Sequence, residues 1–261
     1  MIKISEILGY QPIDIHSHLD HGVEGDRRQR VGNSAWQVHK CELDFIKEGY
    51  DIVGISCGAF STFSSLSEVH AYEENEYLYE LAQKTDWIYQ WIAIDPKQDE
   101  LFEQYKIMMA SPKTLGIKLH TWHNYDIIEY ADKIFSFANK LGATVLMHNV
   151  CIPDMVNFAN KYPDMKLIIA HIAGEEWIDA INNAKHKNIY VDTSGGMSAL
   201  NNVIERAVER VGADNILFGT DTYSTGFQVG RIAWARISDA DKKKILRDNA
   251  KRLFPRAFGE I

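Results

Sequence analysis

The sequences TVLMH at residues 144–148 and KLIIAH at residues 166–171 are two short apolar runs separated by one helix-length segment. Nearly continuous apolar runs of this kind are typical of parallel strands that are covered by helices on one side and packed core on the other. Between them, Pro153 suits the first turn of a helix over about 153–161. The segment therefore predicts a strand–helix–strand unit with parallel strands.

The same alternation continues along the whole chain. The strand candidates are 12–16, 52–56, 88–94, 115–120, 144–148, 166–171, 188–192 and 215–220. The helix candidates are 34–49, 70–84, 98–110, 125–141, 153–161, 175–186, 198–212 and 228–236, with a terminal helix at 239–252. Eight strands close a parallel (β/α)8 TIM barrel, which usually takes about 250 residues. The 261 residues therefore predict one α/β barrel domain over 1–261.

The composition is that of a globular protein without a membrane segment. The formal net charge is −8 and there is no long basic run, which argues against nucleic acid as a partner. No window reaches the roughly 18 apolar residues of a membrane span, and the amino terminus lacks a signal-peptide pattern. The 3 cysteines are widely spaced and predict reduced thiols. We therefore expect a cytoplasmic protein that acts on a small-molecule substrate.

Two histidines end the first predicted strand. Side chains two residues apart share one face of a strand, so His16 and His18 can converge inside the barrel. By the same alternation, Ile13 and Ile15 are expected to face the helices. The pair alone is a weak signal, because a histidine at a strand end is usually a hydrogen-bonded core residue.

Three further residues strengthen the case for a metal site. The fifth run ends in His148, the sixth in His171, and the eighth in Asp221. In a parallel barrel these strand ends meet at one rim, where TIM-barrel enzymes build their sites. Imidazole and carboxylate together suit zinc, which in catalytic sites keeps a position for water. Asp221 would orient or deprotonate that water, and His171 would polarise a substrate carbonyl or act as a further ligand.

The fourth predicted strand and the loop after it supply the predicted substrate-binding side chains. Lys118 and His120 share one face of the strand and are expected to point inward. A lysine inside a barrel is costly unless paired, which leaves three interpretations: an anchor for an anionic substrate group, a carbamate that bridges two metals, or a structural ion pair. The loop residues Trp122, His123 and Tyr125 would contact the substrate, or the two aromatic residues would only cap the strand.

With this combination the sequence resembles the amidohydrolase superfamily, specifically the amidohydrolase-related (amidohydrolase 2) branch of TIM-barrel metal-dependent hydrolases. The pieces IDIHSH at 13–18, GIKLH at 116–120, LFGTD at 217–221 and DNAKRLF at 248–254 look like signatures of that branch. The resemblance spans nearly the whole chain. It implies one or two divalent metals, often zinc, and hydrolysis of an amide, lactone or ester. It also suggests a homodimer or larger assembly.

The same branch includes decarboxylases similar to aminocarboxymuconate-semialdehyde and resorcylate decarboxylases. In those enzymes the HxH pair, the strand-five histidine and the strand-eight aspartate bind one zinc, and the strand-six histidine acts on the substrate. Carried over to this sequence, the ligands are His16, His18, His148 and Asp221, and the catalytic histidine is His171. We expect one ion rather than two, zinc ahead of manganese.

The predicted function is a metal-dependent hydrolase that acts on a C–N, lactone or ester bond of a small polar, carboxylated substrate. The chain is shorter than the decarboxylases of the branch, which favours hydrolysis and leaves a zinc-dependent non-oxidative decarboxylase as the first alternative. A catalytically silent metal-binding barrel is the second. Some lactonases of the superfamily work without a metal, and in that case the histidines would bind substrate and move protons. The chain has no GxSxG, GxxxxGK[ST] or GxGxxG motif, so serine hydrolase, nucleotide hydrolase and dehydrogenase functions lack support.

Overall fold

The computed structural model describes residues 4–19, 43–66, 71–121, 125–148, 151–222 and 224–259. In this part of the chain eight parallel strands form one sheet in sequence order. They are β1 Ile13–Leu19, β2 Cys57–Thr62, β3 Ile88–Ala93, β4 Thr114–Leu119, β5 Thr144–Met147, β6 Lys166–Ile169, β7 Ile189–Asp192 and β8 Ile216–Leu217. Backbone hydrogen bonds from Ile15 N to Phe218 O (3.0 Å) and from Asp221 N to His16 O (2.7 Å) join β1 to the segment after β8. The predicted TIM barrel is confirmed.

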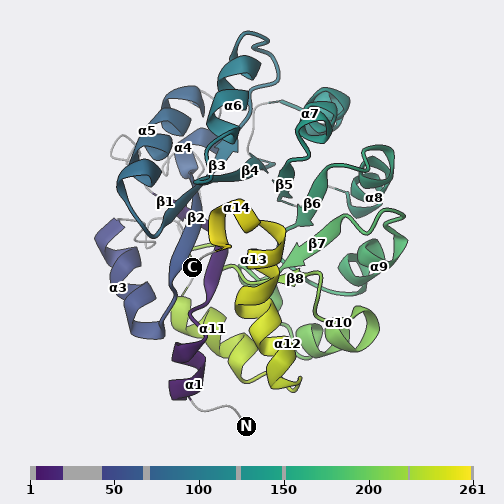
Figure 1. Ribbon diagram of the computed structural model, residues 1–261. Coiled ribbons are helices and arrows are strands. Elements are labelled where there is room, and N and C mark those ends of the chain that lie inside the picture. Colours follow the sequence, from purple (N-terminus) through teal and green to yellow (C-terminus); the bar gives the residue numbers. More distant parts are fainter. Residues whose placement is uncertain are drawn as a thin grey trace.

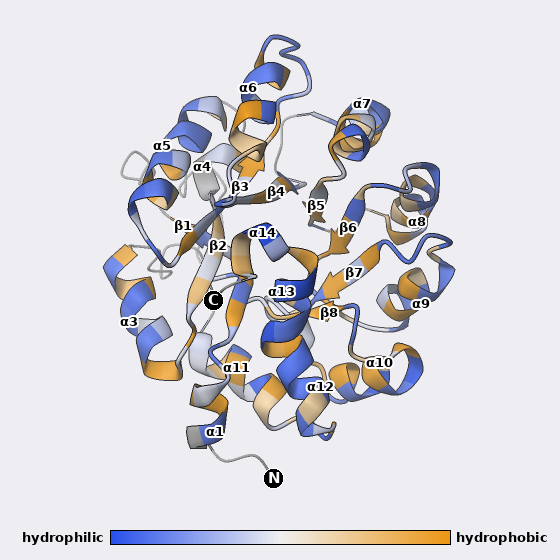
Figure 2. Ribbon diagram, viewed as in Figure 1, coloured by the Kyte–Doolittle hydropathy of each residue, from blue (hydrophilic) through white to orange (hydrophobic). Residues whose placement is uncertain are grey.

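Helices alternate with the strands and form a ring around them (Figure 1). They are α1 Ile4–Gly9, α3 Leu43–Val53, α4 Phe63–Leu66, α5 Ala71–Lys84, α6 Leu101–Met109, α7 Ile127–Leu141, α8 Ile152–Lys161, α9 Glu175–Asn183, η2 Met197–Ala199, α10 Val203–Val211, α11 Thr225–Ala233, α12 Asp239–Lys243, the π-helical turn η3 Lys244–Asp248, α13 Asn249–Leu253 and α14 Pro255–Phe258. In Figure 2 the strands are mostly hydrophobic, and the surrounding helices carry both hydrophobic and hydrophilic residues. None of the helices in the described ranges is long and apolar enough to cross a membrane.

Two apolar layers enclose the strands. The outer layer lies between strands and helices and contains, for example, Val145 of β5 and Phe135 of α7. The inner layer fills the amino-terminal part of the barrel with residues from every strand, namely Ile13, Ile15, Cys57, Ala59, Tyr89, Trp91, Leu115, Leu146, Ile168, Tyr190 and Leu217. Phe254 and Phe258 close this end, where α13 and α14 lie across the barrel (Figure 1). The carboxyl end of the barrel therefore remains for polar side chains.

The predicted alternation of β1 was wrong at its start. Ile13 and Ile15 belong to the layer inside the barrel instead of facing the helices. A register shift between Asp14 and Ser17 inserts one extra residue relative to β2, as in a β-bulge. The bulge turns His16 inward directly after an inward Ile15. The conclusion that His16 and His18 converge thus holds for a different reason than simple alternation.

The second predicted strand was also placed too early. Residues 52 and 53 end α3, and β2 begins at Cys57. Gly54 has φ +76°, the left-handed conformation that often follows the last turn of a helix. The apolar run 52–56 therefore combines a helix end with a turn. Of the predicted helix 34–49, residues 34–42 lie outside the described ranges, and α1 was not predicted.

A buried carboxylate ties β1 to β8 and to α3. Asp14 Oδ1 accepts hydrogen bonds from the backbone N–H groups of His16 and Thr220, both at 3.0 Å. Asp14 Oδ2 accepts from Thr220 Oγ1 at 2.5 Å and from the Tyr50 hydroxyl at 2.6 Å. Burial raises the pKa of Asp14 to about 7, although these four hydrogen bonds lower it. This carboxyl group fixes the position of the β8 rim relative to His16.

A second carboxylate fastens the loop after β7 to the outer helices. Glu205 of α10 accepts hydrogen bonds from Arg231 Nη2 of α11 at 2.9 Å and from Arg236 N at 3.0 Å. Arg231 Nε also donates to the carbonyl of Ser198 in that loop, at 3.1 Å. Burial alone would raise the pKa of Glu205, but the hydrogen bonds outweigh it and lower the pKa to about 2.

We predict that Glu205→Gln lowers the free energy of unfolding at pH 7 by about 1 to 2 kcal/mol, because the substitution replaces charged hydrogen bonds by neutral ones. The folded pKa of Glu205 lies below the usual value of 4.5, so its contribution is present above pH 4.5 and is lost as the pH falls toward 2. Urea unfolding at pH 7 and pH 4 should therefore give a smaller difference from wild type at pH 4. Glu209→Gln on the same helix, whose side chain is 71% exposed, is the matched control and should show little difference at either pH. An equal loss at both pH values for Glu205→Gln would contradict the assignment.

Candidate functional site

The five residues predicted from strand ends form one cluster at the carboxyl end of the barrel. The Nε2 atoms of His16 and His18 lie 3.6 Å and 3.1 Å from Asp221 Oδ1. Nε2 of His171 lies 3.9 Å from Asp221 Oδ2, and His148 Nδ1 lies 3.0 Å from the same histidine nitrogen. Donor atoms of His16, His171 and Asp221 all come within 4.8 Å of one another. The barrel thus gathers side chains that are up to 205 residues apart in sequence.

The backbone at this rim has left-handed residues that are held by cross-strand hydrogen bonds. His171, Asp221 and Thr222 have φ values of 59°, 57° and 60°, a left-handed conformation that costs about 1–2 kcal/mol for a residue with a side chain. The backbone N–H of His171 donates to Asp192 Oδ1 at 3.1 Å. The Thr222 hydroxyl accepts from His18 N at 2.7 Å and donates to His18 O at 3.0 Å. These cross-strand hydrogen bonds hold the conformation that aims the imidazole and carboxylate at one point.

The Nε2 atoms of His16 and His18 both face the carboxylate of Asp221. Nδ1 of His18 lies 3.3 Å from the carbonyl oxygen of Ser61 and 3.0 Å from the Ser61 hydroxyl, which can donate or accept. When Nδ1 donates to Ser61, Nε2 is bare; when the Ser61 hydroxyl donates to Nδ1, Nε2–H donates to Asp221. Burial lowers the pKa of His18, and burial together with the charge of Lys118 lowers the pKa of His16 to about 3. In the first form Nε2 of His18 and Asp221 Oδ1, 3.1 Å apart, would repel each other unless a cation lay between them. The donor set therefore fits a divalent metal ion.

Lys118 points into the barrel as predicted and reaches the same cluster. Its side chain is fully buried, and its Nζ donates to Nε2 of His16 at 2.6 Å. Burial lowers the pKa of Lys118 to about 8, although the carboxylates of Asp221 and Asp192 raise it. The lone pair of His16 Nε2 serves either this hydrogen bond or a metal. The amine of Lys118 and a metal ion would therefore compete for His16.

The other predicted substrate-binding residues have different surroundings. The ring of His120 is buried and lies 4.1 Å from that of His148, between centroids. Tyr125 is buried, and its hydroxyl donates to the carbonyl oxygen of Ile94, directly after β3, at 2.9 Å. Trp122 and His123 lie outside the described residues.

Sequence reasoning missed two polar residues at the end of β7. Asp192 is fully buried, and its Oδ2 lies 2.9 Å from Nδ1 of His16. The Ser194 hydroxyl lies 2.9 Å from Nδ1 of His16 and 2.9 Å from Nδ1 of His171. The rule that selected Asp221 could have selected Asp192, because the seventh predicted strand, 188–192, also ends in an aspartate. No such rule selects Ser194, because it lies beyond the strand end and its position depends on the conformation of the loop after β7.

The backbone of Gly195 lies directly against the cluster. Its φ is +71°, and a Cβ built there would lie 2.9 Å from Nδ1 of His171 and 3.3 Å from Asp221 Oδ2. Its carbonyl oxygen accepts a hydrogen bond from Gln228 Nε2 at 2.8 Å, which anchors this turn to α11. Both the backbone angle and the available space require glycine at this position.

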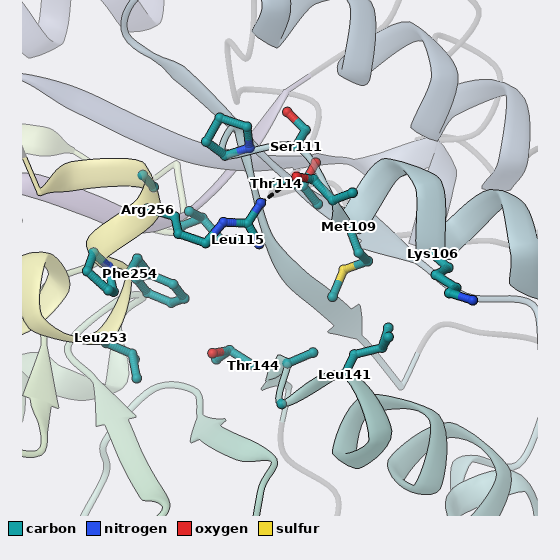
Figure 3. A pocket seen from close by; sticks show the side chains of 16 residues that line it. Lys106, Met109, Ser111, Thr114, Leu115, Leu141, Thr144, Leu253, Phe254 and Arg256 are labelled. Carbon is teal, nitrogen blue, oxygen red and sulfur yellow. Dashed lines mark hydrogen bonds between the residues drawn. The ribbon is translucent and has the colours of Figure 1, made fainter.

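A separate cavity of about 340 Å³ lies at the opposite, amino-terminal end of the barrel (Figure 3). It opens between the beginnings of β4 and β5 and the segment 253–257 of α13 and α14. Met109, Leu115 and Phe254 supply apolar walls, and Arg256 donates a hydrogen bond to the carbonyl oxygen of Ala110 at its edge. Its described lining contains no imidazole or carboxylate. The cluster of imidazoles and the Asp221 carboxylate lies at the other end of the barrel.

A (β/α)8 barrel with imidazoles and a carboxylate converging at the carboxyl ends of its strands is the architecture of a TIM-barrel enzyme. The family model described as Amidohydrolase matches residues 13–256, and the chain belongs to this family. The predicted membership is confirmed. No curated protein sequence matches the chain.

Several solved structures have the same fold. A dihydroxybenzoic acid decarboxylase from Polaromonas sp. JS666, with bound manganese and 2-nitroresorcinol, gives a TM-score of 0.72 at 18% identity and covers 94% of this chain and 96% of its own. An amidohydrolase from Burkholderia multivorans with bound zinc gives 0.71 at 15% identity, covering 94% and 99%. A structure named as a 2-pyrone-4,6-dicarboxylic acid hydrolase, from Pseudomonas putida, gives 0.72 at 15% identity, covering 95% and 98%. The family and these neighbours are enzymes, and they include both hydrolases and decarboxylases.

We predict that Gly195→Ala disturbs the cluster, because the new methyl group would crowd His171 and Asp221 and force a left-handed alanine. The cost of about 1–2 kcal/mol should lower the melting temperature by about 3–6 °C. Gly196→Ala is the matched control, because no heavy atom lies within 4 Å of a Cβ at Gly196 and its φ is −76°. Thermal unfolding of both variants checks this. Equal melting temperatures for the two would show that the close approach at Gly195 is unimportant.

Proposed function

We propose that the protein is a metal-dependent hydrolase that adds water to a C–N, lactone or ester bond of a small, carboxylated substrate. The observation that carries this proposal is the convergence of the imidazole Nε2 atoms of His16 and His18 on the carboxylate of Asp221. Membership in the Amidohydrolase family supports it. Neighbours with bound zinc or manganese support a divalent metal, for which we propose one ion, zinc ahead of manganese.

In this proposal His16, His18, His148 and Asp221 hold the metal, with His171 beside them. When bound, the metal would supply the positive charge that acidifies a water molecule and polarises a carbonyl group. Burial, followed by the charge of Lys118, lowers the pKa of both His16 and His148 to about 3. Both imidazoles are therefore neutral at physiological pH, which is the form that binds a metal.

Asp221 and His171 are the proposed acid–base residues. Burial alone would raise the pKa of Asp221, but its hydrogen bond with His18 and the neighbouring imidazoles hold that pKa well below the usual range. Asp221 is therefore ionised and can accept a proton from the attacking water. His171, when it also carries a proton on Nε2, would donate a hydrogen bond to the oxygen on which negative charge develops. The accepted proton then passes to the leaving nitrogen or oxygen, which completes hydrolysis with one water consumed.

Lys118 is the proposed anchor for a substrate carboxylate. It is a fully buried amine at the base of the cluster, with its Nζ on His16. A buried ammonium is costly without an anionic partner, and a substrate carboxylate would provide one. This role also frees the lone pair of His16, because the ammonium would turn from the imidazole to the substrate.

Decarboxylation is the second candidate, favoured by the Polaromonas neighbour that is named as a decarboxylase. Lys118 would hold the carboxylate that leaves, and the C–C bond to it would break with release of CO2. His171 or Asp221 in its protonated form would deliver a proton to the ring carbon, so that a C–H bond replaces the broken bond. The same side chains could therefore serve either reaction.

We predict that the metal-loaded protein converts at least one member of a panel of carboxylated lactones, amides and esters into a product heavier by one water, without CO2. His171→Asn should lower kcat by about 100-fold or more, because one proton-transfer or oxyanion-stabilising group is lost. Mass spectrometry of products and a CO2 assay with dihydroxybenzoates in the same panel distinguish the reactions. Release of CO2 would replace hydrolysis by decarboxylation, and absence of any turnover would leave the silent barrel. Full activity of His171→Asn would remove His171 from the mechanism.

The role of Lys118 is tested in the same assay by the KM and the metal content of a Lys118 variant. Lys118→Met should raise KM for the carboxylated substrate by about 10-fold or more, as expected for loss of a buried charge pair, and should leave metal content unchanged. Lys113→Met is the control, because Lys113 donates to the backbone carbonyls of Thr85 and Asp86, on the strand connections at the other end of the barrel. Loss of a second metal equivalent in Lys118→Met would instead favour a carbamate.

A further inference from the structure

The end of β7 carries a carboxylate that is saturated with hydrogen-bond donors. Asp192 Oδ1 accepts from the backbone N–H groups of His171 and Ser194, at 3.1 Å and 2.9 Å, and from the Ser194 hydroxyl. Its other oxygen, Oδ2, lies 2.9 Å from Nδ1 of His16. Asp192 and Ser194 are both fully buried, so each of these hydrogen bonds is made without water.

These contacts determine which nitrogen of His16 carries the proton. An ionised carboxylate can only accept, so Nδ1 of His16 must donate to Asp192. Nε2 is then bare, in agreement with the hydrogen bond that Lys118 donates to it at 2.6 Å.

The same reasoning extends to His171 through Ser194. Because the Ser194 hydroxyl gives its proton to Asp192, its oxygen is left to accept from Nδ1 of His171 at 2.9 Å. The carbonyl oxygen of Ser194 lies 3.2 Å from the same nitrogen and can only accept. Nδ1 of His171 therefore carries the proton, and its Nε2 faces Asp221 and His148.

We propose that Asp192 and Ser194 are positioning residues that fix the Nδ1–H tautomer of both His16 and His171. One carboxylate thereby keeps two Nε2 lone pairs directed into the cluster. The use of these lone pairs for a metal rests on the proposed function, but the tautomer assignment does not. The pair acts through the imidazoles and does not itself reach the reacting atoms.

Asp192→Asn tests this without a change in side-chain size. If the amide oxygen takes the place of Oδ1 and accepts from the three donors there, the NH2 group faces Nδ1 of His16. Two donors cannot face each other, so His16 must move its proton to Nε2. That tautomer has no lone pair for a metal or for Lys118.

The first measurement is 15N NMR of the histidine side chains in the metal-free protein, with His16 assigned by the signals that disappear in His16→Gln. Wild type should show His16 protonated at Nδ1, and Asp192→Asn should show it protonated at Nε2. Thr193→Val is the matched control between the two positioning residues, since the described residues offer the buried Thr193 hydroxyl no hydrogen-bond partner. It should keep the wild-type tautomer. An Nδ1–H His16 in Asp192→Asn, or an Nε2–H His16 in wild type, would overturn the proposal.

The second measurement is Zn2+ affinity, by competition with a chromogenic chelator. Asp192→Asn should bind zinc about 10- to 100-fold more weakly than wild type, the usual effect of losing a partner that orients a metal ligand. Ser194→Ala, which loses the hydroxyl acceptor but keeps the Ser194 carbonyl, should have a smaller effect and serves if Asp192→Asn fails to fold. Wild-type affinity in both variants would overturn the role of the pair at the metal. If wild type binds no zinc, the proposed function fails, while the NMR result still decides the tautomer.

Discussion

The carboxyl group of Asp14 is the interaction on which the rest of the site depends. It accepts hydrogen bonds from β1, from the segment after β8 and from α3, and so it holds the barrel closed where the first and last strands meet. The β1 bulge lies directly beside it and places His16 inside the barrel. Because Thr220 is bound to Asp14 twice, the adjacent Asp221 is delivered to a fixed distance from His16. The hydrogen bonds that close the barrel at Asp14 therefore also set the positions of His16 and Asp221.

The two ends of the barrel differ in what they bury: apolar side chains at the amino-terminal end and polar side chains at the carboxyl end. The amino-terminal end is filled by aromatic and aliphatic side chains under α13 and α14, and it stabilises the fold. At the carboxyl end the same burial is applied to polar groups, where it lowers the pKa values of His16 and Lys118 to about 3 and about 8. Burial thus keeps the imidazoles of His16 and His148 neutral. The left-handed backbone at His171 and Asp221 is the conformational cost of this arrangement.

Strand ends were the most informative feature of the sequence, because a parallel barrel brings all of them to one rim. That topological rule identified His148, His171 and Asp221 from single residues, and it applies equally to Asp192. Finer placement depended on local backbone geometry that the apolar pattern does not encode. The β1 bulge reversed the expected orientation of Ile13 and Ile15. The apolar run 52–56 predicted a strand, although residues 52 and 53 end α3. Ser194 and Gly195 act through the conformation of one loop, so no periodicity could have selected them.

In the function proposed above, His16, His18, His148 and Asp221 bind one divalent metal. Anomalous diffraction at the zinc edge, from crystals grown with zinc and without chelator, tests it most directly. We predict one peak among these four side chains, about 2.0–2.2 Å from one nitrogen of each histidine and from the carboxylate, with Lys118 turned away from His16. A map with no peak among them, and with the Lys118 amine still hydrogen-bonded to His16, would contradict it.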